Sequence, residues 1–343
     1  MELENFFVKV KEITDIQPHP NADALELAIV EGWQVVVKIG QFHKGDIALH
    51  IPPNALVPQE VSDAWGVTQY LSKGRVRVVK LRGEPSYGFL VENDTNAAVG
   101  TDLKNYYEIT EWEPPEKFFG GDVEKPHSYF EFYPSMQNLY NFPDIPNGEV
   151  ICLEKIHGTN SAIGMVLEND ERVTLVGSRK LLRKRGKDSI YERPYLRFQE
   201  DMDGLLNTLF DNPQEYIPSL SPELVRSVII YGEIYGSGVQ NLQYGYNGQT
   251  VYAAFDIAIN GKFLSFDDCA KLFNEYGIPM APILYRGEYS FNKIQEVACG
   301  NTTLMDGDAH IREGVVMKPV VEQAHPKIGR VIFKCKNPDY ELL

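Results

Sequence analysis

Short apolar runs rich in β-branched residues recur through the first 105 residues, and glycine or proline stands between them. Runs bounded in this way are typical of short strands joined by tight turns. Residues 75–82 alternate basic and apolar side chains, apart from a slip at Val78 and Val79, which predicts a half-buried strand with a basic outer face. Several such strands in about 100 residues predict a small barrel or sandwich. The runs are residues 6–10, 28–30, 34–39, 47–51, 75–81 and 88–91.

The rest of the chain differs in composition from this first part. Residues 106–147 are rich in aromatic residues and proline, which indicates a connector packed over a neighbouring domain rather than a solvated linker. From residue 148 onwards the pattern is mixed α+β, and a helix is expected after Ser265 because Gly277 suits the position just beyond its end. We therefore expect a β domain at 1–105, a connector at 106–147 and an α+β domain at 148–343.

Charge is unevenly distributed along the chain. The 33 basic and 48 acidic residues give a net charge of −15. This balance alone argues against a nucleic-acid-binding protein, because phosphate contacts need lysine and arginine. Residues 178–187 (SRKLLRKRGK) nevertheless hold six cations and no acid. This run predicts a local phosphate-binding patch, with a solvated surface loop as the alternative.

Several classes of protein are disfavoured by the sequence. No apolar run approaches the roughly 20 residues that a membrane helix needs. The first residues have no basic segment followed by an apolar core, which argues against a secretory signal. The four cysteines show neither a C-x-x-C pattern nor a zinc spacing, so we expect reduced, mostly buried thiols. These features predict a cytoplasmic protein without a membrane segment.

The most informative segment is residues 153–160, LEKIHGTN. A strand-like run ends there in a polar turn that holds Lys155 and Gly158, and a second run follows it. A lysine at a strand end, where the glycine permits close approach of the backbone, is suited to act as a nucleophile. A surface hairpin with an exposed lysine is the alternative interpretation of this segment alone.

Further polar clusters lie on later strand-like runs. Asp256 stands between Phe255 and Ile257, and a buried carboxylate there needs a partner or a metal ion. Lys334 and Lys336 share one face of a strand, which by itself is also typical of a solvated face. The remaining clusters are Gly177-Ser178-Arg179, Gly232-Glu233 and Glu313-Gly314 with Lys318.

Taken in order, these clusters resemble the motifs of the covalent nucleotidyltransferase superfamily, which contains ATP-dependent ligases and mRNA capping enzymes. The string Glu154-Lys155-Ile156-His157-Gly158 is similar to that of ATP-dependent RNA ligases, since DNA ligases usually carry Asp in place of His157. A β domain ahead of the motifs, with only seven residues after Lys336, resembles the Deinococcus-type branch. The resemblance implies an α+β fold: an N-terminal OB-like β-barrel that positions nucleic acid, then a nucleotidyltransferase (ATP-grasp-like ligase) domain of antiparallel sheets and helices.

The resemblance also implies a reaction and its partners. Lys155 would attack ATP to form lysyl-AMP, AMP would pass to an RNA 5′-phosphate, and a 3′-OH end would displace it. The substrate would be RNA ends, held at a nick in a duplex on an RNA or DNA template. A capping-type guanylyltransferase that uses GTP, or a non-catalytic OB-containing RNA-binding protein, is the alternative.

The site residues follow from the same resemblance. Lys155 would be the catalytic nucleophile, Phe255 would stack on adenine, and Glu233 would bind a ribose hydroxyl. ATP would be bound by Glu154, Lys155, Gly158, Asn160, Arg179, Glu233, Phe255, Lys318, Lys334 and Lys336. Mg²⁺ or Mn²⁺ would be bound by Glu313, Asp256 and Glu233. Nucleic acid would be bound by Arg179, Lys180, Arg183, Lys184, Arg185 and Lys187.

Two features of the first 105 residues lie outside these motifs. Residues 18–23, PHPNAD, resemble a short phrase of tRNA-binding OB modules, in which we expect His19 to be structural. A second basic stripe is predicted at Arg75, Arg77, Lys80 and Arg82.

Overall fold

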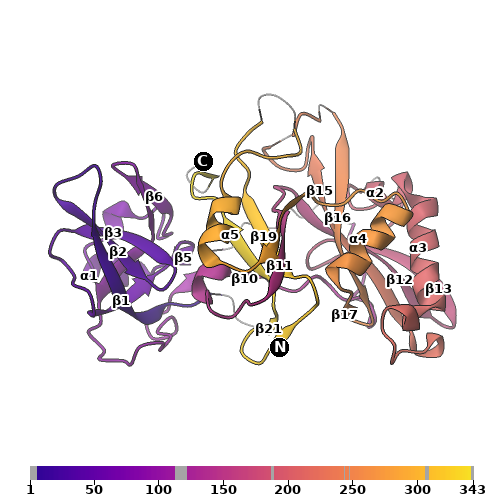
Figure 1. Cartoon of the computed structure of the whole chain (residues 1–343), viewed down its shortest axis with the longest axis horizontal. Coiled ribbons are helices and arrows are strands. Elements are labelled where there is room, and N and C mark those ends of the chain that lie inside the picture. Colours follow the sequence, from indigo (N-terminus) through magenta and orange to yellow (C-terminus); the bar gives the residue numbers. More distant parts are fainter. Residues whose placement is uncertain are drawn as a thin grey trace. The chain divides into compact units, whose positions relative to one another are not determined.

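The computed structural model describes residues 6–112, 122–186, 189–242, 244–246, 248–305 and 309–340 (Figure 1). The chain divides into two compact units. The smaller unit consists of Met1–Lys117, Gln137–Asp144 and Pro338–Leu343, and the larger unit consists of Phe118–Met136 and Ile145–Asn337. The segment 106–147 is thus divided between the two units, and its residues 113–121 lie outside the described part.

An antiparallel sheet with the strand order β3-β2-β1-β4-β8 forms the frame of the smaller unit. Side chains alternate along its strands, so that Trp33, Val35 and Val37 of β3 are buried while their neighbours are less so. The register of β1 shifts between Ile13 and Asp15, which adds local twist. The strands are β1 (Lys9–Pro18), β2 (Leu25–Val30), β3 (Trp33–Lys38), β4 (Ile47–Ile51) and β8 (Phe89–Glu92).

A hairpin of β6 (Val78–Leu81) and β7 (Glu84–Tyr87) contacts β3 at the free edge of this sheet. The side-chain amide of Gln34 donates to the carbonyl of Pro85 at 2.9 Å, and the amide of Val36 donates to Ser86 Oγ at 3.0 Å. Because β7 leads directly into β8 at the opposite edge, these contacts curl the sheet towards closure. The strand predicted at residues 75–82 is therefore present but shorter.

Small elements complete this unit. Trp33 packs on Tyr140 with 4.9 Å between the ring centroids, which ties residues 137–144 to the sheet. The other elements are β5 (Ala55–Leu56), which pairs with β9 (Thr110–Glu111), α1 (Gln59–Ala64), β10 (Gln137–Asn138) and the 3-10 helices η1 (Thr68–Tyr70) and η2 (Leu139–Asn141).

The larger unit contains two antiparallel sheets. The strands of the first are, in order, β14 (Leu182–Arg183), β13 (Glu171–Gly177), β12 (Thr159–Glu168), β15 (Ser227–Gly236), β16 (Thr250–Ile259) and β17 (Lys262–Phe263). In the second sheet β22 (Phe333–Lys336), β19 (Gly314–Pro319), β11 (Glu149–Glu154) and β18 (Ile283–Glu288) follow one another. A separate short pair consists of β20 (Ala324–His325) and β21 (Gly329–Arg330).

Helices α3 and α4 lie beside the first sheet (Figure 1) and pack through Leu206 and Phe273 against Ile163 and Ile230. Helix α4 begins where the sequence predicts, because the Ser265 side chain accepts a hydrogen bond from the amide of Asp268. The helices are α2 (Arg193–Arg197), α3 (Gln199–Asp211), α4 (Phe266–Glu275) and α5 (Phe291–Ala298), with 3-10 helices η3 (Pro213–Glu215) and η4 (Pro222–Leu224).

The other face of the first sheet packs against the second sheet. Ile151 and Leu153 of β11 share an apolar cluster with Tyr235 of β15 and Ala253 of β16. The end of β11, and with it the segment LEKIHGTN, is therefore held where the two sheets meet.

Two further expectations concern the whole chain. The four cysteines are free thiols, and all except Cys299 are buried, as predicted. No helix of the described ranges has the length and apolar character that would let it cross a membrane.

Candidate active site

Lys155 directly follows β11, and its turn is fixed by both sheets. The amide of Lys155 donates to the carbonyl of Gly314 at 2.9 Å, at the start of β19. Gly158 lies against β15 so closely that a Cβ there would be 2.2 Å from the carbonyl oxygen of Ile234. Only glycine fits this position, which is the close backbone approach that the sequence predicts.

Glu313 is the ionic partner of Lys155. Its Oε1 lies 2.6 Å from Lys155 Nζ, and its Oε2 lies 3.6 Å from His157 Nδ1. Burial raises the pKa of Glu313, but the charge of Lys155, the hydrogen bond from His157 and the charge of Lys336 outweigh it and hold the pKa at about 2. Glu313 is therefore an anion at neutral pH, and it orients the lysine amine.

Glu233, on β15, is a second carboxyl group at this site. The pKa of Glu233 is raised to about 8, chiefly by burial and also by the negative charge of Glu313, against the lowering effect of Lys155 and Arg179. The charge of Lys155 lowers the pKa of both carboxyl groups, so both lie near the lysine. Their oxygens are hard ligands of the kind that divalent cations prefer. Among the described residues no group of three or more His, Cys, Asp or Glu could hold a metal ion. A cation here would need further oxygen ligands from water or phosphate.

Asn160 pairs in register with Glu233 across β12 and β15. Its side-chain oxygen is buried and, within the described part of the chain, has no hydrogen-bond partner. A buried acceptor without a donor is unfavourable. This oxygen is therefore available to a ligand at the same edge of the sheet.

Lys334 and Lys336 lie on one face of β22, as predicted. The alternate residues, Phe333 and Cys335, are fully buried, whereas both lysines are half-buried. Lys336 contributes to the low pKa of Glu313, which places its charge at the Lys155 site. Lys336 pairs in register with Gly314 at the start of β19, and Lys334 pairs with Val316, two residues later in β19.

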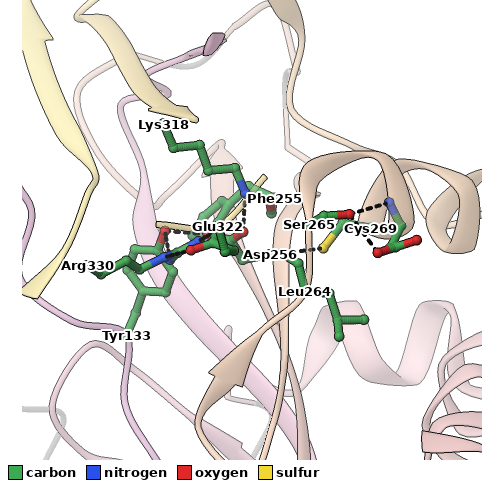
Figure 2. A network of polar contacts seen from close by, with 10 residues as sticks. Tyr133, Phe255, Asp256, Leu264, Ser265, Cys269, Lys318, Glu322 and Arg330 are labelled. Atoms are coloured by element: carbon green, nitrogen blue, oxygen red, sulfur yellow. Dashed lines mark hydrogen bonds and ion pairs between the residues drawn. The ribbon is translucent and has the colours of Figure 1, made fainter. Parts of the chain in front are cut away.

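Asp256 and Lys318 belong to a different network, which Figure 2 shows. Asp256 accepts from Tyr133 Oη at 2.5 Å, from Arg330 at 3.0 Å and from Lys318 Nζ, and Arg330 also pairs with Glu322 at 2.5 Å. Burial raises the pKa of Asp256, but the charges of Arg330 and Lys318 hold it below its usual range. The side chains of Lys318 and Asp256 are 2% and 1% exposed.

This network differs from the roles that the sequence predicts for its members. The sequence predicts Asp256 as a metal ligand and Lys318 as an ATP ligand, and leaves open whether Asp256 has a partner or a metal. The structure supplies partners, and Lys318 is one of them. Their charges neutralise each other in the interior, and their roles towards ATP and a metal ion remain predictions.

Glu154 and Phe255, both predicted to bind ATP, are also engaged within the protein. The carboxylate of Glu154 accepts from the hydroxyl of Thr302, and from the amide and hydroxyl of Thr303 at 2.9 and 2.7 Å. Phe255 makes an edge contact with the ring of Tyr133, with 5.0 Å between centroids. Their roles towards ATP remain predictions.

The predicted basic patch separates into two kinds of residue. Arg183 is 4% exposed and lies 3.2 Å from Asp122, and Arg185 lies 3.0 Å from Glu192. Arg183 is thus paired with an acid that the neighbouring segment supplies, and its contact with nucleic acid remains a prediction. Arg179 and Lys180 are exposed and Lys184 is half-buried, whereas Lys187 lies outside the described residues.

Some residues that build the site have no role predicted from the sequence. His157 contacts Glu313, and its amide donates to Tyr244 Oη at 2.6 Å. His157 stands inside the motif that identifies the lysine, so its position was a usable signal. Tyr244, Thr302 and Arg330 lie in irregular segments or a short strand far along the chain, where no local pattern marks them.

The arrangement of a lysine with two carboxyl groups and a lysine-bearing strand, at the junction of two antiparallel sheets, is suited to nucleophilic attack on a phosphate. Residues 148–336, more than half of the chain, match the RNA ligase family model. The chain therefore belongs to the RNA ligase family. An OB-fold domain model matches residues 7–92. A search of curated protein sequences found no significant match.

Solved structures similar to this chain include RNA ligases of Naegleria gruberi. The ligase with PPi is 21% identical, with 97% of each chain covered and a TM-score of 0.75. A point mutant with ATP and Mn is 20% identical with a TM-score of 0.77, and another with AMP and Mn is 21% identical with a TM-score of 0.76. For both mutants 98% of each chain is covered. The predicted α+β fold, with an OB-like barrel before the ligase domain, is confirmed.

Proposed function

We propose that this chain is an ATP-dependent RNA ligase that joins a 3′-OH RNA end to a 5′-phosphate end through lysyl-AMP on Lys155. The RNA ligase family supplies the class of reaction. The observation that supports the finer mechanism is the 2.6 Å contact between Lys155 Nζ and Glu313 at a turn fixed by both sheets.

The reaction has three balanced steps. Lys155 Nζ loses its proton to solvent and forms a bond to the α-phosphorus of ATP, and pyrophosphate leaves. An oxygen of the RNA 5′-phosphate then attacks the same phosphorus and frees the lysine. Finally the 3′-OH attacks the RNA phosphate, and AMP leaves. Because a carboxylate with a pKa of about 2 is a poor proton acceptor, Glu313 positions the amine and does not store its proton.

We propose ATP and Mg²⁺ or Mn²⁺ as the cofactors. Structures of the Naegleria gruberi ligase with ATP and Mn, and with AMP and Mn, support this choice. The unpartnered oxygen of Asn160 beside Glu233, with Glu313 nearby, fits a divalent ion and its waters. Such an ion supplies positive charge to the phosphate oxygens. Lys334, Lys336 and Arg179 would contact the phosphates directly.

The RNA partner follows from the same proposal. We expect the ends to be presented at a nick in a duplex whose template is RNA or DNA. The exposed cations Arg179 and Lys180 would contact its phosphates beside the lysine site. A cytoplasmic location remains a prediction.

Intact-protein mass spectrometry tests the first step. The full chain is incubated with ATP and Mg²⁺, or with GTP and Mg²⁺, as wild type, as Lys155→Ala and as Lys271→Ala. Lys271 is an exposed lysine of α4 and serves as the matched control. We expect one added AMP in wild type and in Lys271→Ala, and none in Lys155→Ala.

The other outcomes decide between the alternatives. An added GMP would instead support a capping-type guanylyltransferase. The absence of any adduct, in protein free of pre-bound AMP that still binds RNA, would favour a non-catalytic RNA-binding protein. An AMP adduct in Lys155→Ala would assign the nucleophile to another residue.

A further inference from the structure

The loop between β15 and β16 contacts the turn that carries Lys155. Tyr244 Oη accepts a hydrogen bond from the amide of His157 at 2.6 Å, and the side-chain amide of Gln240 donates to the carbonyl of Gly158 at 3.3 Å. Both partners lie more than 80 residues beyond the turn in the sequence. Two adjacent main-chain positions after the lysine are therefore held by one distant loop.

Tyr244 has a backbone conformation that is unfavourable for a tyrosine. Its φ angle is 51°, and within the described part of the chain it is the one aromatic residue with a positive φ. A bulky side chain in the left-handed region is uncommon, because its Cβ lies close to the following carbonyl oxygen. A tyrosine retained in this conformation indicates that its side chain has a role.

The ring of Tyr244 is held between two other rings. Its edge contacts have centroid distances of 5.2 Å to Tyr235 of β15 and 4.6 Å to His310. Tyr244 is 3% exposed and shares an apolar cluster with Ile156 of the turn itself. Because edge contacts of this kind orient a ring, the hydroxyl of Tyr244 is fixed towards the amide that it binds.

The segment that contains His310 connects the two sides of the turn. The amide of Thr302 donates to the carbonyl of His310 at 2.9 Å. The hydroxyl of Thr302 donates to the carboxylate of Glu154, the residue before the lysine. Contacts therefore run in a continuous path from one side of the lysine to the other. The members of this path are Glu154, Thr302, His310, Tyr244 and His157.

Glu313 belongs to the segment that closes this path. It follows His310 by three residues, and its Oε1 lies 2.6 Å from Lys155 Nζ. The path thus holds the main chain on both sides of the lysine, and its own segment supplies the carboxylate that meets the amine. Attack on a phosphate depends on such placement, because a displacement of about 1 Å can lower a rate about 100-fold.

We propose that Tyr244 is a positioning residue for the nucleophile: its hydroxyl holds the amide of His157 so that Lys155 Nζ stays against Glu313. The effect on catalysis rests on the proposed function, whereas the contact itself rests on geometry. Tyr244 takes no chemical step and acts through the turn. Its hydroxyl is the group that matters, because the ring contacts do not depend on it.

Two phenylalanine variants of the full chain test this role. Tyr244→Phe removes the hydroxyl and keeps the ring. The matched control is Tyr276→Phe, which removes a hydroxyl that lies 2.6 Å from Thr208 Oγ1, between the end of α4 and α3. Each variant loses one hydrogen bond of the same length, so we expect similar falls in melting temperature, about 2–4 °C. Other differences between the variants therefore report position in the molecule.

Two measurements without ATP test the contact and the placement of the lysine. Hydrogen exchange followed by mass spectrometry reports the amides of residues 154–160. We expect exchange of the His157 amide to become about tenfold faster in Tyr244→Phe only. Brief acetylation with acetic anhydride reports Lys155, with the exposed Lys271 as an internal reference. Acetylation of Lys155 should rise several-fold in Tyr244→Phe, because an amine released from its ion pair is free to attack.

The rate of lysyl-AMP formation tests the effect on catalysis. At saturating ATP we expect Tyr244→Phe to lower the single-turnover rate about 10–100-fold, with the KM for ATP changed by less than about twofold. Sealing of RNA that already carries a 5′-adenylyl group should stay near the wild-type rate, because this step does not use the amine. Tyr276→Phe should keep both rates. A general loss of stability would lower both, so this split separates positioning from folding.

Each of the remaining outcomes is decisive. Unchanged exchange and acetylation in Tyr244→Phe would remove the contact from the placement of Lys155. Faster exchange with an unchanged rate of lysyl-AMP formation would show that the contact stabilises the turn without positioning the nucleophile. Equal losses on both RNA substrates would make Tyr244 a structural residue. If wild type forms no lysyl-AMP but Tyr244→Phe alone raises acetylation of Lys155, the ligase proposal fails while the positioning role stands.

Discussion

The larger unit holds two lysine–carboxylate pairs that look alike in sequence and differ in environment. Lys155 and Glu313 are 19% and 11% exposed at the junction of the sheets, whereas Lys318 and Asp256 are 2% and 1% exposed within the unit. Water still reaches the first pair, whereas the second pair is shielded from it. Burial and partners, not residue type, separate the accessible pair from the buried pair.

The balance of partners explains the difference. Asp256 receives two cations and a tyrosine hydroxyl, so both of its oxygens are already engaged (Figure 2). Glu313 holds Lys155 and faces His157, and the neighbouring Glu233 has its pKa raised to about 8. The open site therefore combines several cations with one carboxylate that is ionised at neutral pH, Glu313, and this balance suits the binding of a phosphate.

The largest expected effect is on Lys155. Lys155→Ala removes the nucleophile, so we expect sealing of RNA with an ordinary 5′-phosphate to fall by more than about 10³-fold. RNA that already carries a 5′-adenylyl group bypasses this step, and the variant should still seal it. Gel analysis of both substrates on one nicked duplex measures the difference.

Equal loss on both substrates would break the comparison, because Lys155 would then act in the last step or in folding. Wild type supplies the reference with each substrate. Lys271→Ala, on the exposed side of α4, supplies the control for the loss of a lysine.

The second prediction compares the loss of Asp256 with the loss of Glu313. Asp256→Asn leaves Lys318 and Arg330 partly unpaired in the interior, so we expect the free energy of unfolding to fall by about 3–5 kcal/mol. Glu313 lies in a more open site, so for Glu313→Gln we expect the free energy of unfolding to fall by only about 1–3 kcal/mol. Its lysyl-AMP formation, in contrast, should fall roughly 10²–10³-fold. Urea unfolding and mass spectrometry on the same samples measure both.

Lys318→Met sharpens this test. Asp256 then keeps Arg330 and Tyr133, so the loss of stability should be smaller than in Asp256→Asn. If Asp256→Asn is stable but forms no lysyl-AMP, the buried network would have to be counted as part of the active site.

These pairs also show what could be predicted from the sequence. Short strands between turn residues mark the β domain, and the N-cap Ser265 with Gly277 marks α4, because both are local patterns. The junction of the two sheets is not local. It requires the second sheet, which forms by pairing between β11 and β19, more than 150 residues apart, and no window of sequence reveals this pairing.

The candidate site divides in the same way. Lys155, Gly158 and Glu313 lie at strand ends, in the order of the family's motifs, so they could be predicted from the sequence. Nothing local distinguishes Lys318 from Lys336, since both are lysines on strands. Only the partner at Asp256 separates them. Arg330 completes that partner set from a short strand that carries no motif.

A smaller effect concerns the basic stretch 178–187. Arg183 is buried against Asp122 and Ser178, so Arg183→Ala should lower the free energy of unfolding by about 2–4 kcal/mol. Arg179 is exposed, and Arg179→Ala should change stability by less than about 0.5 kcal/mol. Sealing by Arg179→Ala should nevertheless fall about tenfold through one lost phosphate contact. A stable Arg183→Ala would contradict the division of this stretch.

The smallest effect follows from the two carboxyl groups that flank Lys155, and its sign differs between them. The folded pKa of Glu233 is about 8 against an ordinary value of 4.5, so the unfolded chain ionises first and stability falls as the pH rises through this window. The folded pKa of Glu313 is about 2, so its contribution is present above pH 4.5 and is lost as the pH falls towards 2. In metal-free buffer, Glu233→Gln should therefore raise the free energy of unfolding by about 1–2 kcal/mol at pH 8 and leave it unchanged below pH 4.5. Urea unfolding of both proteins across this range measures the difference. A gain that did not depend on pH would show that Glu233 is already ionised in the folded protein, and Glu313 would then share the site with a second anion.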